Sequence, residues 1–339
     1  MKSPSVPASP WQRFYEGAHR LRQRWYRTRA QRLPRPVISV GNLHWGGSGK
    51  TPLTAALAAH LRDRGRAVCI LSRGYKGEGQ GVRVVSTGEG PLLGPLVAGD
   101  EPVLLAGALP GVAVVVGPER YRAGLQALER LPVPPDLFLL DDGFSHLALH
   151  RDLDLVAFPA ADPFGGGRLP PSGRLREPLA SMSRAHAAIL TNAAGTPGEG
   201  AALARALRPH GFKGPGFASV TRPGSPHFAD GAALPPGSPV FLVTAIARPE
   251  GFTETVRGLG FEIRGELRFP DHHGYPAASL EKIAEAFRAS GAVALLTTSK
   301  DRVKLLGRLD LPLAELPIHA LPEPAFWAWL DGEIGRMAA

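Results

Sequence analysis

Residues 37–64 read VISVGNLHWGGSGKTPLTAALAAHLRDR and carry the strongest structural signal in the chain. The apolar run 37–40 predicts a buried strand, and the pattern of residues 51–64 predicts a helix. The glycine-rich loop between them can point consecutive backbone N–H groups at phosphate oxygens, and the helix dipole adds to the attraction. The stretch therefore predicts a P-loop; the alternative is a chance glycine-rich turn before a helix.

The P-loop pattern also assigns roles to single residues. Lys50 is expected to reach the β- and γ-phosphates of a nucleotide, and Thr51 to ligate Mg²⁺. The standard pattern has glycine five residues before Gly49, where this chain has His44. The core GGSGKT is still close to that of nucleotide-binding proteins with modified P-loops. The residues expected to bind the nucleotide are Gly46, Gly47, Ser48, Gly49, Lys50, Thr51 and Pro52.

A P-loop needs a second acidic group to hold its metal ion, and this group should end a buried strand. Residues 137–144 read LFLLDDGF, where four apolar residues predict the strand. Asp141 and Asp142 stand at its carboxyl end, where α/β sheets bind ligands. We expect one of the two carboxylates to contact Mg²⁺ directly or through water. The alternative is a strand that ends in an acidic turn.

Apolar runs and helical patterns alternate along the chain, which predicts an α/β fold with a parallel sheet. At 339 residues the chain is long enough for two domains. We expect residues 1–35 to form a basic amphipathic helix, residues 36–210 a P-loop NTPase-like domain, and residues 211–339 a smaller α/β domain that closes over the cleft. A stretch rich in glycine and proline, 195–239, marks the boundary.

The composition is that of an ordinary globular protein, with 44% hydrophobic and 20% charged residues, and it excludes wholesale disorder. Cys69 is the single cysteine, so the chain forms no internal disulfide, and we expect a reducing compartment, most simply the cytoplasm. We expect neither a signal peptide nor a transmembrane span.

Basic charge is concentrated at the N-terminus. The net charge is +9, and residues 1–35 hold nine lysines and arginines against one glutamate. A helix over residues 11–32 would place aromatic and apolar side chains on one arc and arginines opposite, which is typical of a helix in a membrane interface. The alternative is a helix packed on its own domain. The residues of the apolar arc are Trp11, Phe14, Tyr15, Ala18, Leu21 and Trp25.

Three further motifs give weaker signals. Residues 99–102 read GDEP and begin an apolar helical run, so Asp100 is either an N-cap or a catalytic group. Residues 270–275 read PDHHGY, which suits acid–base chemistry or a solvated turn. Residues 297–301 read TTSKD and suit contact with a nucleotide base, an interdomain contact or a surface loop.

Together the motifs resemble those of the tetraacyldisaccharide 4′-kinase family. The resemblance rests on GNLHWGGSGKTP, LSRGYKG, GDEP, LLDDGFSHL, GRLPPSGRLREP, DHHGY and TTSKD, in this order over nearly the whole chain. It implies transfer of the γ-phosphoryl group of ATP, with Mg²⁺, to the 4′-hydroxyl of a tetraacylated glucosamine disaccharide 1-phosphate. It also implies a peripheral enzyme, which we expect to be monomeric, at the cytoplasmic face of the inner membrane, and it accounts for the basic arm.

The resemblance implies roles for further residues. Asp100 is similar to the family's general base, assisted by His272 in preference to His273. The carboxylates implied at the metal site or the substrate are Asp141, Asp142, Glu101 and Glu177. The residues implied in contacts with nucleotide or substrate are Tyr75, Arg120, Asn42 and His273. The chain departs from the family pattern at His44, where a small hydroxyl residue is more common, and at Ser145, which replaces a glutamine.

Two other functions fit parts of the sequence. A membrane-shuttling ATPase switch would use the same P-loop and amphipathic helix, and would couple ATP hydrolysis to dimerisation without phosphorylating a lipid. A basic module that binds nucleic acid would account for the high pI of 10.1, but the excess charge lies in one arm rather than on a folded patch. We therefore expect no nucleic-acid partner.

Overall fold

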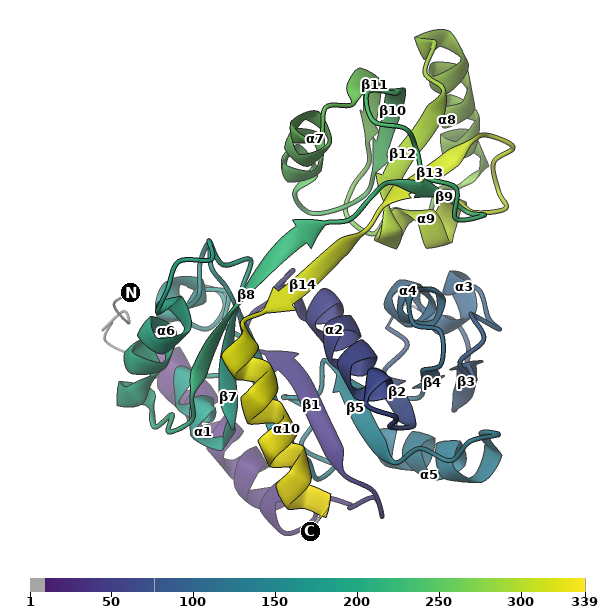
Figure 1. Cartoon of the computed structure of the whole chain (residues 1–339). Helices are drawn as coiled ribbons and strands as arrows, with labels where there is room; N and C mark the ends of the chain where they lie inside the picture. Colours follow the sequence, from purple (N-terminus) through teal and green to yellow (C-terminus); the bar gives the residue numbers. More distant parts are fainter. Residues whose placement is uncertain (1–9, 76, 339) are drawn as a thin grey trace.

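The structure is a computed structural model that describes residues 10–75 and 77–338. Figure 1 shows a larger body, a smaller body above it, and two long strands, β8 and β14, that run between them. The larger body contains a nine-stranded sheet with the order β14-β8-β7-β6-β1-β5-β2-β4-β3. The smaller contains a five-stranded sheet with the order β11-β10-β12-β13-β9.

The strands of the large sheet are β1 (Val37–Asn42), β2 (Val68–Ser72), β3 (Arg83–Ser86), β4 (Ala113–Val116), β5 (Leu137–Asp141), β6 (Leu153–Pro159), β7 (Ala187–Thr191), β8 (Gly216–Pro223) and β14 (Ile318–Pro322). The helices of the larger body are α1 (Pro10–Arg27), α2 (Lys50–Asp63), α3 (Pro95–Ala98), α4 (Asp100–Ala108), α5 (Arg120–Arg130), α6 (Glu199–Leu207), α10 (Pro324–Ala338) and the 3₁₀ turns η1 (Gly165–Gly167), η2 (Leu179–Arg184) and η3 (Arg208–His210). The smaller body has β9 (His227–Phe228), β10 (Pro239–Thr244), β11 (Glu262–Arg268), β12 (Ala294–Thr298), β13 (Leu313–Leu316), α7 (Pro249–Gly258), α8 (Ala277–Ser290) and α9 (Ser299–Leu305).

The centre of the large sheet confirms the predicted parallel α/β fold. β1 lies between β5 and β6 and is parallel to both. All six residues of β1 are buried, as expected for a strand covered on both faces. The register pairs Val40 with Asp141, so the P-loop and the aspartate pair leave the sheet side by side at its carboxyl edge.

The two sheets do not divide the chain at residue 210, where the domain boundary was predicted. β8 and β14 both belong to the large sheet, so the smaller body lies between them in the sequence. The last helix, α10, returns to the larger body, where Phe326 and Leu330 join the core of β1 and α2. The prediction took the glycine- and proline-rich stretch as the domain boundary, but β8, a strand of the large sheet, lies within that stretch.

The predicted N-terminal helix is present as α1. Part of its apolar arc packs on the larger body, and part of it is exposed. Tyr15 packs on the larger body and donates a hydrogen bond to the carbonyl of Arg176, 3.0 Å away. Leu21 and Trp25 are exposed by 70% and 57%. The side chains of Trp11 and Phe14 lie outside the described residues. No described helix combines the length and apolar character that a membrane crossing requires.

Candidate active site

The P-loop is held in shape by groups on β1 and β7. Gly46 and Gly49 have φ angles of 101° and 70°, which are readily available to glycine alone. The Asn42 side-chain amide donates to Ser48 Oγ at 2.7 Å, and Thr191 Oγ1 donates to the Ser48 carbonyl at 2.7 Å. α2 begins at Lys50, directly after the loop. The sequence placed this loop correctly between strand and helix.

Lys50 and Arg176 converge on one carboxylate at the loop. Lys50 Nζ lies 3.5 Å from Asp142 Oδ1, and the two terminal nitrogens of Arg176 donate to the two Asp142 oxygens at 3.0 and 2.7 Å. Burial alone would raise the pKa of Asp142, but the hydrogen bonds from Arg176 and the charge of Lys50 outweigh it and lower the pKa to about 2. Asp142 is therefore ionised, and it keeps two cations beside the phosphate-binding loop.

Asp141 is the carboxylate that suits a metal ion. It is 2% exposed, and its Oδ2 has no hydrogen-bond partner, while Thr54 donates to Oδ1 at 3.4 Å. Burial raises its pKa, and the nearby charges of Glu101 and Asp142 raise it further. A divalent cation at the unpartnered Oδ2 would offset the repulsion that Asp141 meets from Glu101 and Asp142.

The described residues contain no ready-made group of three acidic, histidine or cysteine side chains that could hold a metal by itself. This is compatible with Mg²⁺, because that ion is commonly bound by one or two carboxylates together with substrate phosphates and water. Asp141, Glu101 and the hydroxyl of Thr51 are the groups that would hold it.

Asp100 lies where α4 of the larger body contacts α9 of the smaller body. Its Oδ2 lies 3.8 Å from His272 Nδ1 and 3.6 Å from Lys304 Nζ, and both partners belong to the smaller body. α4 begins at Asp100, and the preceding N-cap position is Gly99, so the capping alternative is wrong. Glu101 follows directly, and its charge raises the pKa of Asp141. α4 also contacts α2, the helix that follows the P-loop.

The structure separates the two adjacent histidines. His272 has a φ of 64°, and its Nε2 lies 3.3 Å from Lys300 Nζ. An ammonium only donates, so Nε2 accepts and the ring proton sits on Nδ1, toward Asp100. His273 stacks on Phe269 at 4.7 Å and shares a hydrogen bond with Ser279 Oγ at 2.8 Å, so it is engaged within the smaller body. Its expected role in substrate contact is not supported.

Arg120 and Tyr75, expected to contact nucleotide or substrate, differ in burial. Arg120 is 6% exposed, and burial together with the charge of Arg73 lowers its pKa to about 10, while Asp142 and Asp141 act in the opposite direction. It is therefore a buried cation close to the aspartate pair. Tyr75 is exposed by 63%, and its backbone carbonyl lies next to Gly99 at the start of α4.

Two expected site residues have other partners. Asn42 braces the P-loop, since its amide donates to Ser48 and to the His44 carbonyl and its oxygen accepts from Arg176. Glu177 is 2% exposed and is bound by Arg184 at 2.9 Å and His19 of α1 at 3.1 Å. We therefore place neither Asn42 at the substrate nor Glu177 at the metal ion.

Replacing Glu177 with glutamine is expected to lower the free energy of unfolding by about 3 kcal/mol, because Arg184 loses a buried counter-charge. Burial alone would raise the pKa of Glu177, but the hydrogen bond from His19 and the charge of Arg184 lower it to about 2, from 4.5. The stabilisation is therefore present above pH 4.5 and is lost as the pH falls toward 2. Urea unfolding at pH 7 and pH 3 measures both effects.

Glu119→Gln is the control for this prediction, because the Glu119–Arg122 pair is exposed and should contribute little. An equal loss of stability in both variants, or a Glu177→Gln enzyme that needs more Mg²⁺ for full activity, would contradict the structural role of Glu177.

Three residues of the site were not given roles from the sequence. Arg176 lies within the GRLPPSGRLREP motif, so its motif was a usable signal. Thr191 ends a buried strand and Lys304 lies in a short helix, and neither stands in a motif that points to phosphate chemistry. Their positions depend on the fold.

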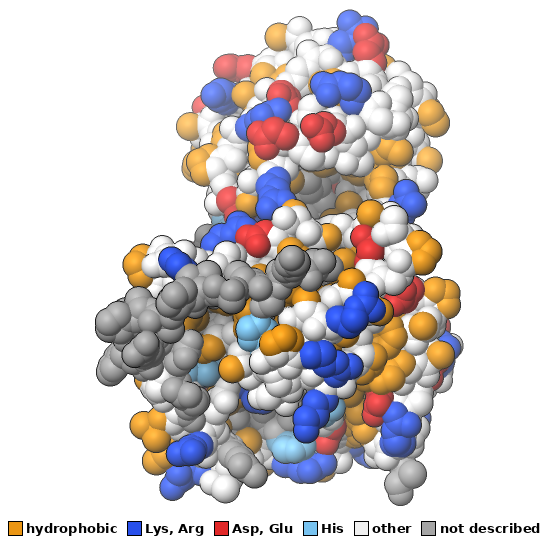
Figure 2. Space-filling view, turned by 90° about the vertical axis from the view of Figure 1, so that its left-hand side faces the viewer, with side chains coloured by type: hydrophobic (Ala, Val, Ile, Leu, Met, Phe, Trp, Pro, Cys, Tyr) orange, Lys and Arg blue, Asp and Glu red, His pale blue; other side chains and the backbone are white. Residues whose placement is uncertain are grey.

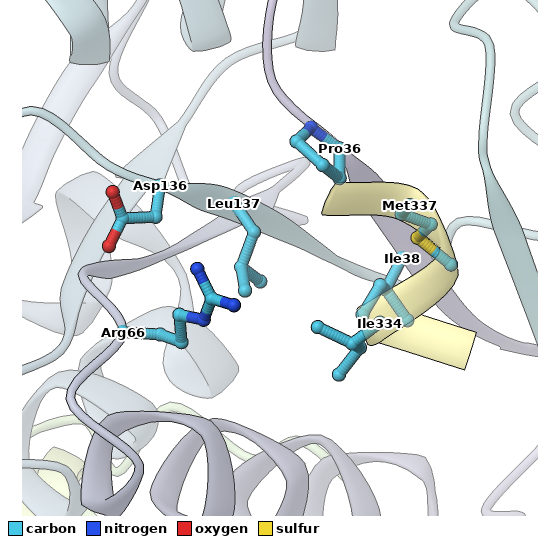
Figure 3. Close-up of a pocket in the computed structure, with 7 residues that line it drawn as sticks. All are labelled: Pro36, Ile38, Arg66, Asp136, Leu137, Ile334 and Met337. Atoms are coloured by element: carbon cyan, nitrogen blue, oxygen red, sulfur yellow. The ribbon is translucent and has the colours of Figure 1, made fainter. Parts of the chain in front are cut away.

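Two cavities lie away from this site. One, of about 30 Å³, is lined by Arg66, Asp136 and apolar residues of β1, β5 and α10 and by Pro36 (Figure 3). It has room for about one water molecule. The other, of about 340 Å³, lies in the smaller body and is lined in part by Phe228, Leu306 and Leu313. Neither includes a residue of the P-loop or of the 99–102 motif.

Residues 6–335 match the profile of the family described as tetraacyldisaccharide-1-P 4′-kinase. The chain belongs to this family. The tetraacyldisaccharide 4′-kinase of Geobacter sulfurreducens is 42% identical over 300 residues, which cover 85% of this chain and 79% of that protein. That of Syntrophobacter fumaroxidans is 42% identical over 336 residues, covering 96% and 87%. LpxK from Aquifex aeolicus, solved in complex with ATP, superimposes with a TM-score of 0.76 at 33% identity and covers 97% of each chain.

Proposed function

We propose that this chain transfers the γ-phosphoryl group of ATP to the 4′-hydroxyl of a tetraacyldisaccharide 1-phosphate, forming lipid IVA. The proposal is supported by two groups of residues, one at the P-loop and one around Asp100. The P-loop follows β1, whose Val40 pairs with Asp141 at the edge of the large sheet. Asp100, next to Glu101, contacts His272 of the smaller body. Family membership supplies the class of acceptor.

Asp100 is the proposed general base. In the reaction the acceptor oxygen forms a bond to the γ-phosphorus, the bond from that phosphorus to the β,γ-bridging oxygen breaks, ADP leaves, and the hydroxyl proton passes to Asp100. His272 orients the carboxylate through the proton on Nδ1. A sugar hydroxyl is a weak nucleophile, so a carboxylate within reach of its proton speeds the attack.

Lys50, Arg176 and Arg120 are the cations available to the transferring group, where charge spreads over the phosphoryl oxygens. When bound, Mg²⁺ neutralises charge on the β- and γ-phosphates. The N–H groups of residues 46–51 bind the phosphate oxygens, and the positive end of α2 adds to their attraction. Closure of the gap would exclude water that would otherwise accept the phosphoryl group.

We place the enzyme as a monomer on the cytoplasmic face of the inner membrane, bound through α1 and without a nucleic-acid partner. Leu21 and Trp25 are exposed, and the guanidinium of Arg29 lies 3.7 Å from the Trp25 ring. This combination suits an interface of acyl chains and anionic headgroups. On the face of the larger body seen in Figure 2, cationic and apolar side chains are interspersed.

Replacing Leu21 and Trp25 together with serine is expected to weaken binding to phosphatidylglycerol vesicles about tenfold or more, because the apolar area buried in the lipid is lost. Sedimentation with vesicles measures the binding. Val293→Ser removes an exposed apolar side chain from the smaller body and is the control. Equal vesicle binding by the double variant and the unaltered protein would show that α1 only packs on its own domain.

The proposed activity is tested with γ-labelled Mg-ATP and tetraacyldisaccharide 1-phosphate in detergent micelles. We expect label at the 4′-position of the lipid and one ADP formed for each lipid phosphorylated. ATP hydrolysis with dimerisation and no labelled lipid would favour the membrane ATPase switch. Salt-sensitive binding to DNA that survives loss of Lys50 would favour the nucleic-acid module.

A further inference from the structure

The smaller body places a second cation, Lys304, against Asp100. The Lys304 side chain is 6% exposed, and its ammonium donates to the His273 carbonyl at 3.1 Å and lies 3.2 Å from Asp301 Oδ1. A buried ammonium is costly unless it is paired. It also lies 5.5 Å from the centre of the Tyr275 ring, and Asp100 Oδ2 of the larger body is 3.6 Å away. Lys304 therefore pairs with one carboxylate of each body, Asp301 of the smaller and Asp100 of the larger.

Asp301 fixes the position of this ammonium. Asp301 is fully buried, and its Oδ2 accepts from the Ala245 N–H at 3.0 Å and the Thr298 hydroxyl at 2.9 Å. Both bonds use the same oxygen, so Oδ1 is directed to Lys304. Asp301, the last residue of the TTSKD motif, thus binds the lysine that contacts Asp100. Of the roles considered for this motif, these contacts support the interdomain one.

Both groups that the smaller body presents to Asp100, the His272 imidazole and the Lys304 ammonium, lie near the same oxygen. His272 Nδ1 and Lys304 Nζ lie 3.8 and 3.6 Å from Oδ2. Because both contacts are made to Oδ2, they leave Oδ1 available to an acceptor hydroxyl. The distances from Asp100 Oδ2 to His272 Nδ1 and Lys304 Nζ exceed those of charge-assisted hydrogen bonds, about 2.7–2.9 Å. Each contact can therefore shorten if the smaller body moves toward the larger one.

We propose that Lys304 is a positioning residue for phosphoryl transfer: held by Asp301, it orients the carboxylate of Asp100 and makes the position of the base depend on the smaller body. The inference rests on the proposed role of Asp100 as the base. In this role Lys304 acts through Asp100, so its removal should slow the chemical step while binding of ATP at the P-loop is retained.

The test is a double-mutant cycle with Lys304→Met and Asp100→Asn, measured at saturating ATP and lipid acceptor. Lys304→Met alone is expected to lower kcat about tenfold or more, because the base is misplaced, with the KM for ATP within about twofold of the original. In the Asp100→Asn protein, Lys304→Met should change kcat by less than about twofold. A purely structural lysine would lower kcat by the same factor in both backgrounds.

Two further variants control for folding. Arg302→Met removes a cation of the same helix, α9, that pairs with Glu315 at 3.3 Å, and it should keep the original kcat. Lys304→Met combined with Asp301→Asn removes both charges of the buried pair, so it should fold well and still show the loss of kcat.

The outcomes are distinguishable. Full activity of Lys304→Met while Asp100→Asn is impaired would overturn the role of Lys304 and leave the base in place. A loss that is the same in both backgrounds would overturn it as well. Full activity of Asp100→Asn would remove the proposed base, and the role of Lys304 with it.

Discussion

Lys50→Ala is expected to lower kcat for phosphoryl transfer about 10³-fold or more, because the cation nearest the P-loop is lost where charge develops on the transferring group. The ammonium lies 3.5 Å from both Ser48 Oγ and Asp142 Oδ1, at the first residue of α2. Water in an enclosed site cannot replace a fixed ammonium, since its dipoles would have to reorganise during the reaction.

The measurement is single-turnover transfer of labelled phosphate to the lipid acceptor, together with binding of a non-hydrolysable ATP analogue. The loop remains braced by Asn42 and Thr191 in the variant, so the fold and part of the affinity should be retained. Lys282→Ala, in exposed α8, is the control and should be as active as the original protein. A Lys50→Ala rate within tenfold of the original would rule out this lysine as the main phosphate cation.

Lys50→Arg should recover only part of the rate. Arginine keeps the charge but presents it as a planar fork rather than a compact ammonium. Arg176 already binds both oxygens of Asp142, so a second guanidinium would compete for the same carboxylate. Recovery of the full rate would indicate that charge alone, and not its placement, is needed at this position.

The central fold was predictable because its signals are local. Three signals follow one another in the sequence: the apolar run of β1, the glycines of the loop and the apolar face of α2. Each one favours the element that forms at its own position. The register of β1 with β5 then brings Asp141 to the loop, as the rule for parallel sheets predicts.

The division between the two bodies could not be read in the same way. β8 and β14 pair with each other although nearly a hundred residues separate them, and nothing local in either strand specifies its partner. Phe326 and Leu330 of α10 show an apolar helix face, but the sequence does not say which core that face joins. Long-range pairing therefore decided the boundary.

The site shows the same limit. The roles that the motifs gave Asp100, His272 and Lys50 stay predictions. Glu177 instead pairs with His19 and Arg184, which come from other elements. The choice between His272 and His273 depends on a backbone with φ of 64°, which turns one ring to the gap and leaves the other on Phe269.

Asp100→Asn is expected to lower kcat by about 10²- to 10⁴-fold, because an amide cannot accept the hydroxyl proton. The affinity for the ATP analogue should stay close to that of the original protein, since Lys50 and the loop are untouched. His272→Ala should lose less, about tenfold, because the carboxylate remains and only its orientation is affected. Single-turnover rates with saturating ATP and lipid acceptor measure both effects on the chemical step.

His273→Ala separates catalysis from folding in this motif. Its ring stacks on Phe269 and lies 5.2 Å from the Tyr275 ring, so the substitution should lower the melting temperature while kcat stays near that of the original protein. Asp100→Asn with His272→Ala should be little slower than Asp100→Asn alone, because the histidine acts through the carboxylate. A His272→Ala effect that persists undiminished without Asp100 would mean that the histidine contacts the acceptor itself, and the base would then have to be sought among the groups around His272.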